Sequence, residues 1–241
     1  MKIAIIGNGR MGRLIQQTAR ERGHEISCVI DVDNQEDFAS EAFRGSDVAI
    51  EFSVPKAAVG NILNAFKAGV PVVSGTTGWT AALPEIRQIC DRGEGTLLYG
   101  SNFSVGVNIF MALNRKLAAM MSRFPGYKPS LTETHHIHKL DHPSGTAITL
   151  AEGIMAEDPA VKGWMEPEAD RQPAADELPV YHVREGEVPG IHTIKWDSPD
   201  DFIEITHSAK SRHGFALGAV MGAEWLVGKK GFHTVTEMFN F

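Results

Sequence analysis

The first hundred residues alternate short apolar runs with stretches of helical spacing, and this alternation limits the possible fold most strongly. A short apolar run bounded by turn residues is typical of a buried parallel strand. Strands that alternate with helices of this length predict βαβ units and a parallel sheet. We therefore expect a doubly wound α/β sheet with strands over 2–6, 25–30, 46–52, 70–73 and 96–99.

The pattern changes after Asn102, where a different arrangement begins. Apolar residues at helical spacing predict a long helix over 105–121, and further helices are expected over 147–155 and 215–227. Strands are expected over 130–138, 181–183, 191–196 and 202–207, with no helices between the last three. We interpret 157–177, rich in Pro, Asp and Glu, as a mobile surface segment. The aromatic tail over 232–241 is compatible with core packing or with an interface.

Charge, hydropathy and cysteine content exclude several classes of protein. The net charge of −7 argues against a nucleic-acid-binding protein, which normally has a basic face. No apolar run approaches the roughly eighteen residues that span a bilayer, so no membrane partner is expected. Cys28 and Cys90 show no disulfide or CxxC spacing, and the N-terminus lacks a signal-peptide cleavage site. These observations predict a cytoplasmic protein.

The loop after the first strand fits the dinucleotide-binding pattern GxGxxG. Gly7 would allow the tight turn, Gly9 the approach of a pyrophosphate to the backbone, and Gly12 the close packing of helix on strand. The free N–H groups of the helix N-terminus would face the phosphates. The expected cofactor-binding residues of this loop are Gly7, Asn8, Gly9, Arg10, Met11 and Gly12.

Asp31 lies nineteen residues after Gly12 at the end of the second strand, where a carboxylate can accept a hydrogen bond from a ribose hydroxyl. Residues 31–37 contain four acids and no Lys or Arg. A 2′-phosphate would find like charge there and no guanidinium partner. NADH is therefore favoured over NADPH, although NADPH stays possible.

Two further loops follow the fourth and fifth strands. In an open parallel sheet, ligands bind at the carboxyl ends of the strands, so both loops are placed for cofactor contact. The alternative is that glycine-rich loops only turn corners. The candidate residues are Gly75, Thr76, Thr77, Gly100, Ser101, Asn102 and Phe103.

The stretch ETHHIHKLDHPSGTA (133–147) contains four histidines, a lysine and two carboxylates. A metal site would need imidazoles from His135, His136 and His138, but successive side chains of a strand point to opposite faces. With no HExxH or cysteine cluster present, we expect no metal. The residues favour acid–base chemistry, because a histidine and Lys139 offer a neutral-pH acid and a cation.

The following Pro143-Ser144-Gly145-Thr146 turn opens a helix. It would present the N–H groups of Gly145 and Thr146 and two hydroxyls as a seat for an anion. A cation, an acid and an anion seat together indicate an anionic substrate that is protonated during reaction. With a nicotinamide site upstream, this indicates hydride delivery coupled to proton delivery.

The stretch 133–147, together with GNGRMG, GTTGW, SNFSVGVN and EITHSAKSR, resembles the 4-hydroxy-tetrahydrodipicolinate reductase family. The resemblance covers nearly the whole chain in the right order. It implies a Rossmann domain over 1–104 completed by 212–241, and an α+β substrate and tetramerisation domain with a mixed open sheet over 105–211. It also implies NAD(P)H-dependent reduction of 4-hydroxy-tetrahydrodipicolinate, a cyclic dicarboxylate, in the diaminopimelate route to lysine, by a homotetramer.

The same resemblance implies the roles of individual residues. His135 would act as acid or base and Lys139 as proton donor, and His136, Ser144, Gly145 and Thr146 would contact substrate. Val32 stands where some relatives carry an arginine, which agrees with NADH. Three alternatives stay open: a dehydrogenase of another substrate, a non-enzymatic dinucleotide sensor, and a metal-dependent hydrolase.

Overall fold

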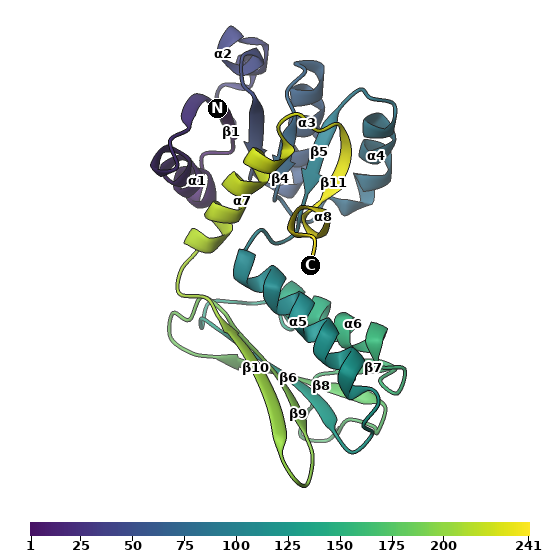
Figure 1. Cartoon of the computed structure of the whole chain (residues 1–241). Coiled ribbons are helices and arrows are strands. Elements are labelled where there is room, and N and C mark those ends of the chain that lie inside the picture. The colour runs from purple at the N-terminus through teal and green to yellow at the C-terminus, as the bar shows by residue number, and fades with distance from the viewer. The chain divides into compact units, whose positions relative to one another are not determined.

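The computed structural model describes all 241 residues as two compact units. One unit comprises residues 1–105 and 212–241, and the other comprises residues 106–211. Figure 1 shows that the chain leaves the first unit once and returns to it through the helix α7 (His213–Leu226). No helix combines the length and the apolar character that crossing a membrane requires.

The first unit is built on a six-stranded parallel sheet with the order β11-β5-β4-β3-β1-β2. Central strands of such a sheet are covered on both faces, and β3 is buried along its whole length. The strands are β1 (Lys2–Ile6), β2 (Glu25–Ile30), β3 (Val48–Glu51), β4 (Val72–Ser74), β5 (Thr96–Tyr99) and β11 (Gly231–Thr234).

Helices cover both faces of this sheet. Side chains from α1 (Arg10–Glu21) and α7 pack on one face around Ile3 and Ile5. Side chains from α3 (Pro55–Lys67) and α4 (Leu83–Asp91) pack on the other face around Ala4 and Ile6. Short helical segments complete the unit: η1 (Gln35–Ala39), α2 (Glu41–Arg44), η2 (Thr80–Ala82) and α8 (Val235–Phe239).

The aromatic tail resolves into the edge strand β11 and the short helix α8. Phe232 packs against the core, Val235 is buried, and Phe241 is 64% exposed. Residues 232–239 therefore pack on the core of the first unit, whereas Phe241 stays exposed. β11 extends the sheet by one parallel strand beside β5, which the sequence pattern did not indicate.

The second unit contains a five-stranded mixed sheet with the order β10-β9-β6-β8-β7. Its centre is β6, which pairs antiparallel with β9 and parallel with β8. The strands are β6 (Lys128–His135), β7 (Gly163–Met165), β8 (Glu177–Arg184), β9 (Ile191–Asp197) and β10 (Phe202–Ser208). The helices α5 (Val105–Met121) and α6 (Gly145–Glu157) lie on one face, where they bury Leu131, Ile194 and Trp196 (Figure 1).

Two expectations about this unit were wrong in detail. The segment 157–177, expected to be a mobile surface segment, contains β7, which pairs with β8 and buries Met165. Three residues are too few to show an alternating pattern, so β7 leaves no recognisable signal in sequence. The strand expected over 130–138 starts two residues earlier and ends at His135, so His136 and His138 lie beyond it.

Candidate active site

The glycine loop of the first unit has the geometry that a dinucleotide requires. Gly7 has φ +97°, and a Cβ there would lie 2.2 Å from the Phe52 carbonyl oxygen. A Cβ on Gly12 would lie 1.9 Å from the Gly7 carbonyl oxygen, so only glycine lets α1 approach β1 this closely. Nothing lies within 4 Å of a Cβ on Gly9, the residue that precedes α1. The loop fits a pyrophosphate because space remains where the phosphates would approach.

Two cavities adjoin this loop. One of about 250 Å³ is lined by the loop, by Asp31 and Val32 after β2, and by the segment after β3. The other, of about 330 Å³, brings Gly9, Arg10 and Met11 together with Gly75, Thr76 and Thr77. The glycine loop therefore lines both cavities, one together with Asp31 and the other together with residues 75–77.

The predicted cofactor residues after β5, Gly100 to Phe103, line neither cavity. A Cβ on Gly100 would lie 2.0 Å from a methyl carbon of Val235, and the Phe103 side chain is buried in the core. The Asn102 amide oxygen accepts from the Ser104 N–H at 2.9 Å. Internal packing thus explains the glycine and the phenylalanine, and this leaves Ser101 and Asn102 as the polar residues of the loop.

Glu51, at the end of β3, was not identified from the sequence. Its buried carboxylate accepts hydrogen bonds from the hydroxyls of Ser74 at 2.7 Å and Thr76 at 2.9 Å, and from the N–H and hydroxyl of Ser53. This carboxylate joins the segments after β3 and β4, which line the two cavities. An acid that ends an apolar strand was the only available signal.

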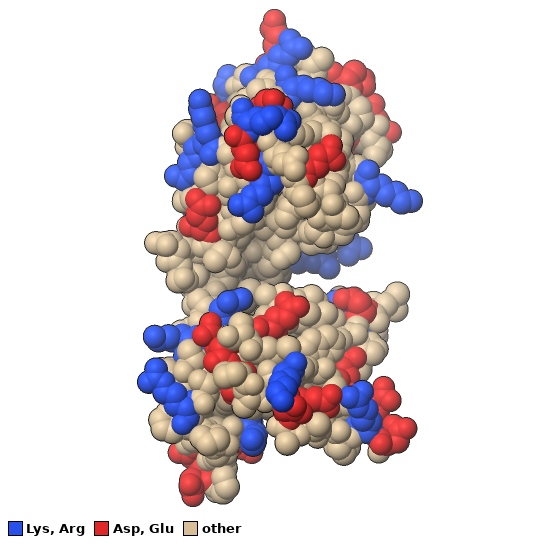
Figure 2. Space-filling view, turned by 90° about the vertical axis from the view of Figure 1, so that its right-hand side faces the viewer, with Lys and Arg blue, Asp and Glu red and all other residues tan.

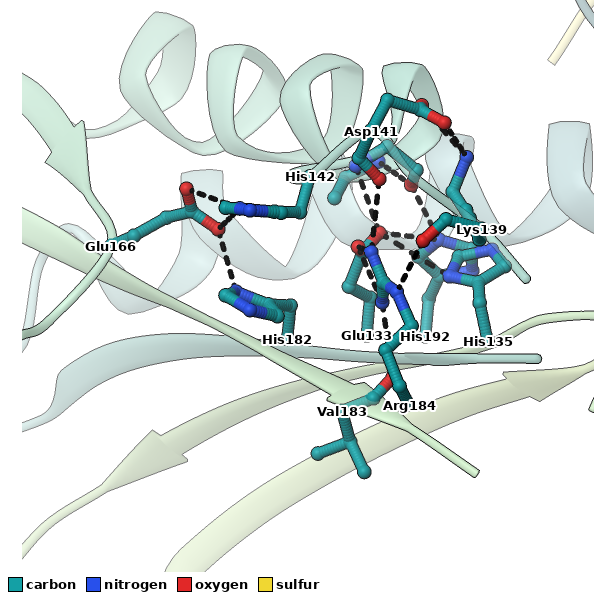
Figure 3. A network of polar contacts seen from close by, with 12 residues as sticks. Glu133, His135, Lys139, Asp141, His142, Glu166, His182, Val183, Arg184 and His192 are labelled. Atoms are coloured by element: carbon teal, nitrogen blue, oxygen red, sulfur yellow. Dashed lines mark hydrogen bonds and ion pairs between the residues drawn. The ribbon is translucent and has the colours of Figure 1, made fainter. Parts of the chain in front are cut away.

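In the second unit, Glu133 and His135 lie on the same buried face at the end of β6. His192 on β9 and Arg184 on β8 reach the same carboxylate, because Glu133 pairs with His192 and His135 with Arg184 in the two strand registers. Figure 3 shows these side chains converging below Lys139. Glu133 Oε2 lies 3.6 Å from His135 Nδ1 and 3.8 Å from His192 Nε2, and Oε1 lies 3.5 Å from the Arg184 guanidinium.

Burial favours the neutral form of both imidazoles of this group. It lowers the pKa of His135, an effect that the Glu133 carboxylate opposes and the positive charge of Lys139 reinforces. Burial likewise lowers the pKa of His192 to about 4. A neutral imidazole has one nitrogen that accepts a proton, so the arrangement offers a buried base beside a buried carboxylate.

Lys139 lies in the loop between β6 and α6. Its ammonium donates to both carboxylate oxygens of Asp141, at 2.7 and 2.8 Å. This ion pair lowers the pKa of Asp141. The Arg184 guanidinium donates to the carbonyl oxygens of Lys139 and Asp141, which holds the loop over the histidines.

The turn that opens α6 differs in one respect from the predicted anion seat. The Ser144 hydroxyl is buried, accepts from the Ala147 N–H as the helix cap, and lies 3.2 Å from His192 Nε2. The Ser144 N–H donates to Glu133 Oε2 at 3.0 Å. Gly145 and Thr146 are the first helical residues, and their N–H groups face the open end of α6. The structure therefore uses Ser144 as an internal connection, so its hydroxyl is not free for the anion seat that the sequence predicts.

The remaining histidines of the stretch separate from this group. His136 has a buried Nδ1 without a hydrogen-bond partner, and exposed His138 pairs with Glu187 at 3.0 Å. The His135–His136–His138 set does not converge. His192 and Arg184 were missed because they lie about fifty residues away on strands whose registers the sequence does not reveal.

Comparison with known proteins supports the resemblance over the whole chain. Residues 1–103 match the family model described as dihydrodipicolinate reductase, N-terminus, and residues 106–241 match its C-terminus. The chain is 48% identical over 240 residues to a 4-hydroxy-tetrahydrodipicolinate reductase of Christiangramia forsetii, covering 100% of this chain and 98% of the relative. It is 34% identical over 266 residues to the enzyme of the same name from Archaeoglobus fulgidus, with complete coverage of both.

A solved structure agrees with the fold. The dipicolinate-bound dihydrodipicolinate reductase from Paenisporosarcina sp. TG-14 superimposes with a TM-score of 0.76 and 21% identity, covering 98% of both chains. The comparison confirms the expected combination of a Rossmann-type unit with a mixed-sheet unit. On its two family models and its full-length relatives, the chain belongs to the dihydrodipicolinate reductase family, now also called 4-hydroxy-tetrahydrodipicolinate reductase.

Proposed function

We propose that the first unit binds NADH in preference to NADPH, and that the buried histidine group of the second unit serves reduction of a cyclic dicarboxylate. The reaction follows from the family: 4-hydroxy-tetrahydrodipicolinate, NAD(P)H and a proton give tetrahydrodipicolinate, NAD(P)⁺ and water. It belongs to the diaminopimelate route to lysine. When bound, the reduced dinucleotide supplies the hydride, and the protein orients the substrate and manages the proton.

The observation that carries the assignment of residues is the convergence of Glu133, His135, His192 and Arg184 beneath the Lys139 loop. We assign His135 as the acid–base residue, because its imidazole is neutral and lies beside a carboxylate that can stabilise the protonated form. Lys139 is the proton donor, and Asp141 holds its ammonium until substrate replaces that ion pair. Glu133 and His192 are positioning residues.

The dicarboxylate substrate would be held at the start of α6. The N–H groups of Gly145 and Thr146, the helix dipole and the Lys139 ammonium all favour a bound carboxylate. His136 completes the proposed contacts. The dipicolinate in the related structure is itself a cyclic dicarboxylate, which supports this class of substrate.

The preference for NADH rests on the segment after β2. Asp31 and the 77% exposed Val32 line the cavity beside the glycine loop, and no Arg or Lys belongs to that lining. A ribose hydroxyl can donate to Asp31, whereas a 2′-phosphate would be repelled by it.

The activity is tested by mixing the protein with NADH and substrate made freshly from pyruvate and aspartate semialdehyde by the preceding enzyme. We expect rapid loss of reduced-nicotinamide absorbance, and a fall of roughly 10²- to 10⁴-fold in kcat for His135→Ala, because general acid–base catalysis is worth about that factor. His138→Ala is the matched control and should keep wild-type turnover. Oxidation of neither nucleotide, although both bind, would favour the dinucleotide-sensor alternative.

Cofactor preference is tested by Val32→Arg. The new guanidinium can pair with a 2′-phosphate, so kcat/KM for NADPH should rise roughly tenfold, the value of about one charge-assisted hydrogen bond. Val32→Gln adds length without charge and should leave the NADH to NADPH ratio unchanged. Wild-type protein that already uses NADPH better than NADH would contradict the proposed preference.

We further propose a cytoplasmic homotetramer that assembles through the sheet of the second unit. α5 and α6 cover one face of this sheet, and the opposite face carries Tyr181 and Val183, 44% and 42% exposed. Their register partners on β6 are Thr132 and Thr134. The same face carries the cross-strand pair of Lys195 and Glu204, so it offers opposite charges as well as apolar and hydroxyl side chains for pairing with a copy of itself.

A further inference from the structure

We propose that His142, Glu166 and His182 form a binding site for a divalent transition-metal ion, Zn²⁺ above all, at the surface of the second unit. The three residues come from separate elements: His142 from the loop before α6, Glu166 from the residue after β7, and His182 from β8. Figure 3 shows both imidazoles directed at the same carboxylate. The site goes beyond the reductase activity and does not depend on it.

The geometry of the three side chains matches what zinc requires. His142 Nδ1 lies 3.0 Å from both carboxylate oxygens of Glu166, and His182 Nδ1 lies 2.8 Å from Oε1. The three ligand atoms all lie within 4.8 Å of one another. Ligands about 2.0–2.2 Å from a tetrahedral Zn²⁺ are roughly 3.3 Å apart, so only small side-chain shifts would admit the ion.

The two imidazole rings are also arranged so that both can bind the same ion. The imidazoles of His142 and His182 stack with centroids 4.1 Å apart and planes 21° apart, and each presents Nδ1 to Glu166. Two imidazoles and one carboxylate are a common donor set for zinc, with a water as the fourth ligand. The side chains are 46%, 36% and 22% exposed for His142, His182 and Glu166, so an ion can enter from solvent.

The buried group of Glu133, His135 and His192 is the competing cluster, but its charges disfavour a cation. Arg184 lies 3.5 Å from the Glu133 carboxylate, and the Lys139 charge acts on His135. The other carboxylate oxygen already accepts from the Ser144 N–H. The ion pairs of Glu166, in contrast, involve only the two imidazoles. Zinc therefore prefers the exposed cluster.

A metal ion bound at this site would restrain the proposed substrate loop, residues 139–145. His142 lies directly between Asp141, which holds Lys139, and the Pro143–Ser144 turn that opens α6. Arg184 already holds the carbonyl groups of Lys139 and Asp141. A bound ion would join the next residue of the same loop to β8, and so would slow the opening of residues 139–145.

The test measures Zn²⁺ binding by titration calorimetry, with untagged, chelator-treated protein and neither NADH nor substrate. We expect one Zn²⁺ per chain, with at least tenfold weaker binding in Glu166→Gln and in His182→Ala. His138→Ala is the matched control, because it removes an exposed imidazole that has only one carboxylate beside it, and it should bind as the wild type does. Hydrogen exchange at residues 139–145 should slow with Zn²⁺ in the wild type and not in Glu166→Gln.

Two results would overturn the site. Unchanged Zn²⁺ affinity in both Glu166→Gln and His182→Ala would show that these residues are not ligands. Loss of binding in His192→Ala, with Glu166→Gln unaffected, would place the ion in the buried cluster. Binding at the proposed site without slower exchange would refute the effect on the loop. Neither titration calorimetry nor hydrogen exchange depends on turnover, so these outcomes remain separate from failure of the reductase assignment.

Discussion

His192 shows how one buried side chain connects the site to the stability of the protein. Burial lowers its pKa to about 4 in the folded protein, against about 6.5 for an unperturbed histidine. Between these two values the unfolded chain binds more protons than the folded one, so the free energy of unfolding falls as pH falls from 6.5 towards 4. This contribution to the free energy of unfolding is complete above about pH 6.5 and is lost progressively as the pH falls towards about 4.

We therefore predict that lowering the pH from 7.5 to 5 costs the wild type about 2 kcal/mol more than it costs His192→Gln. Denaturant unfolding followed by circular dichroism at the two pH values measures the difference. His138→Gln, an exposed substitution of the same type, should keep the wild-type pH dependence. Equal pH dependence in His192→Gln and the wild type would contradict a buried, neutral His192.

At the scale of elements, the packing of α1 on β1 separates structural from binding roles in the glycine loop. A Cβ on Gly12 would collide with the Gly7 carbonyl, whereas a Cβ on Gly9 would meet nothing in the protein. Gly12→Ala should therefore destabilise the protein by about 1–3 kcal/mol, the usual effect of overpacking. Gly9→Ala should leave stability unchanged and weaken NADH binding roughly tenfold, or by about 1.4 kcal/mol, because the methyl group fills space proposed for the pyrophosphate.

Thermal unfolding and fluorescence titration with NADH measure these two effects. The pair is informative because both variants make the same chemical change within two residues of the start of α1. If Gly9→Ala bound NADH as tightly as the wild type, the pyrophosphate would not approach the backbone at this loop. If Gly12→Ala were as stable as the wild type, α1 would not need its close contact with Gly7.

The sequence predicted those elements whose signal is local and repeated. The first five strands of the α/β unit are apolar runs, and the helix α1 has periodic apolar spacing. Glycines mark the turn between β1 and α1. β7 and β11 were missed because β7 lies in a stretch rich in Pro, Asp and Glu and β11 contains one apolar residue, so neither stands out as an apolar run as the equally short β3, β4 and β5 do. Pairing with β8 and β5 orders them.

The candidate site, whose residue roles stay predictions, was visible in the sequence only where its residues are close together along the chain. His135 and Lys139 lie in one conspicuous stretch, which makes them visible without a structure. Glu51, Arg184 and His192 became apparent only from strand register and from hydrogen bonds between distant segments. Such contacts depend on tertiary structure, and a single sequence holds no local record of them.

At the scale of the whole molecule, two compact units supply two different kinds of chemistry. The unit of residues 1–105 and 212–241 has the parallel sheet and glycine loop of a dinucleotide-binding fold. The unit of residues 106–211 has the residues proposed for acid–base chemistry and the helix terminus proposed to hold an anion. Full-length similarity to reductases of one name indicates that the two functions belong to one reaction.

The most direct test of that reaction follows the hydride itself. The protein would be mixed with freshly formed substrate and with NADH that carries two deuterium atoms at the reactive ring carbon. The mass of the product would then be measured by mass spectrometry. We predict tetrahydrodipicolinate with one deuterium atom, formed in amounts equal to the NADH oxidised. Oxidation of NADH without deuterium in the product, or no oxidation with active substrate present, would contradict the account.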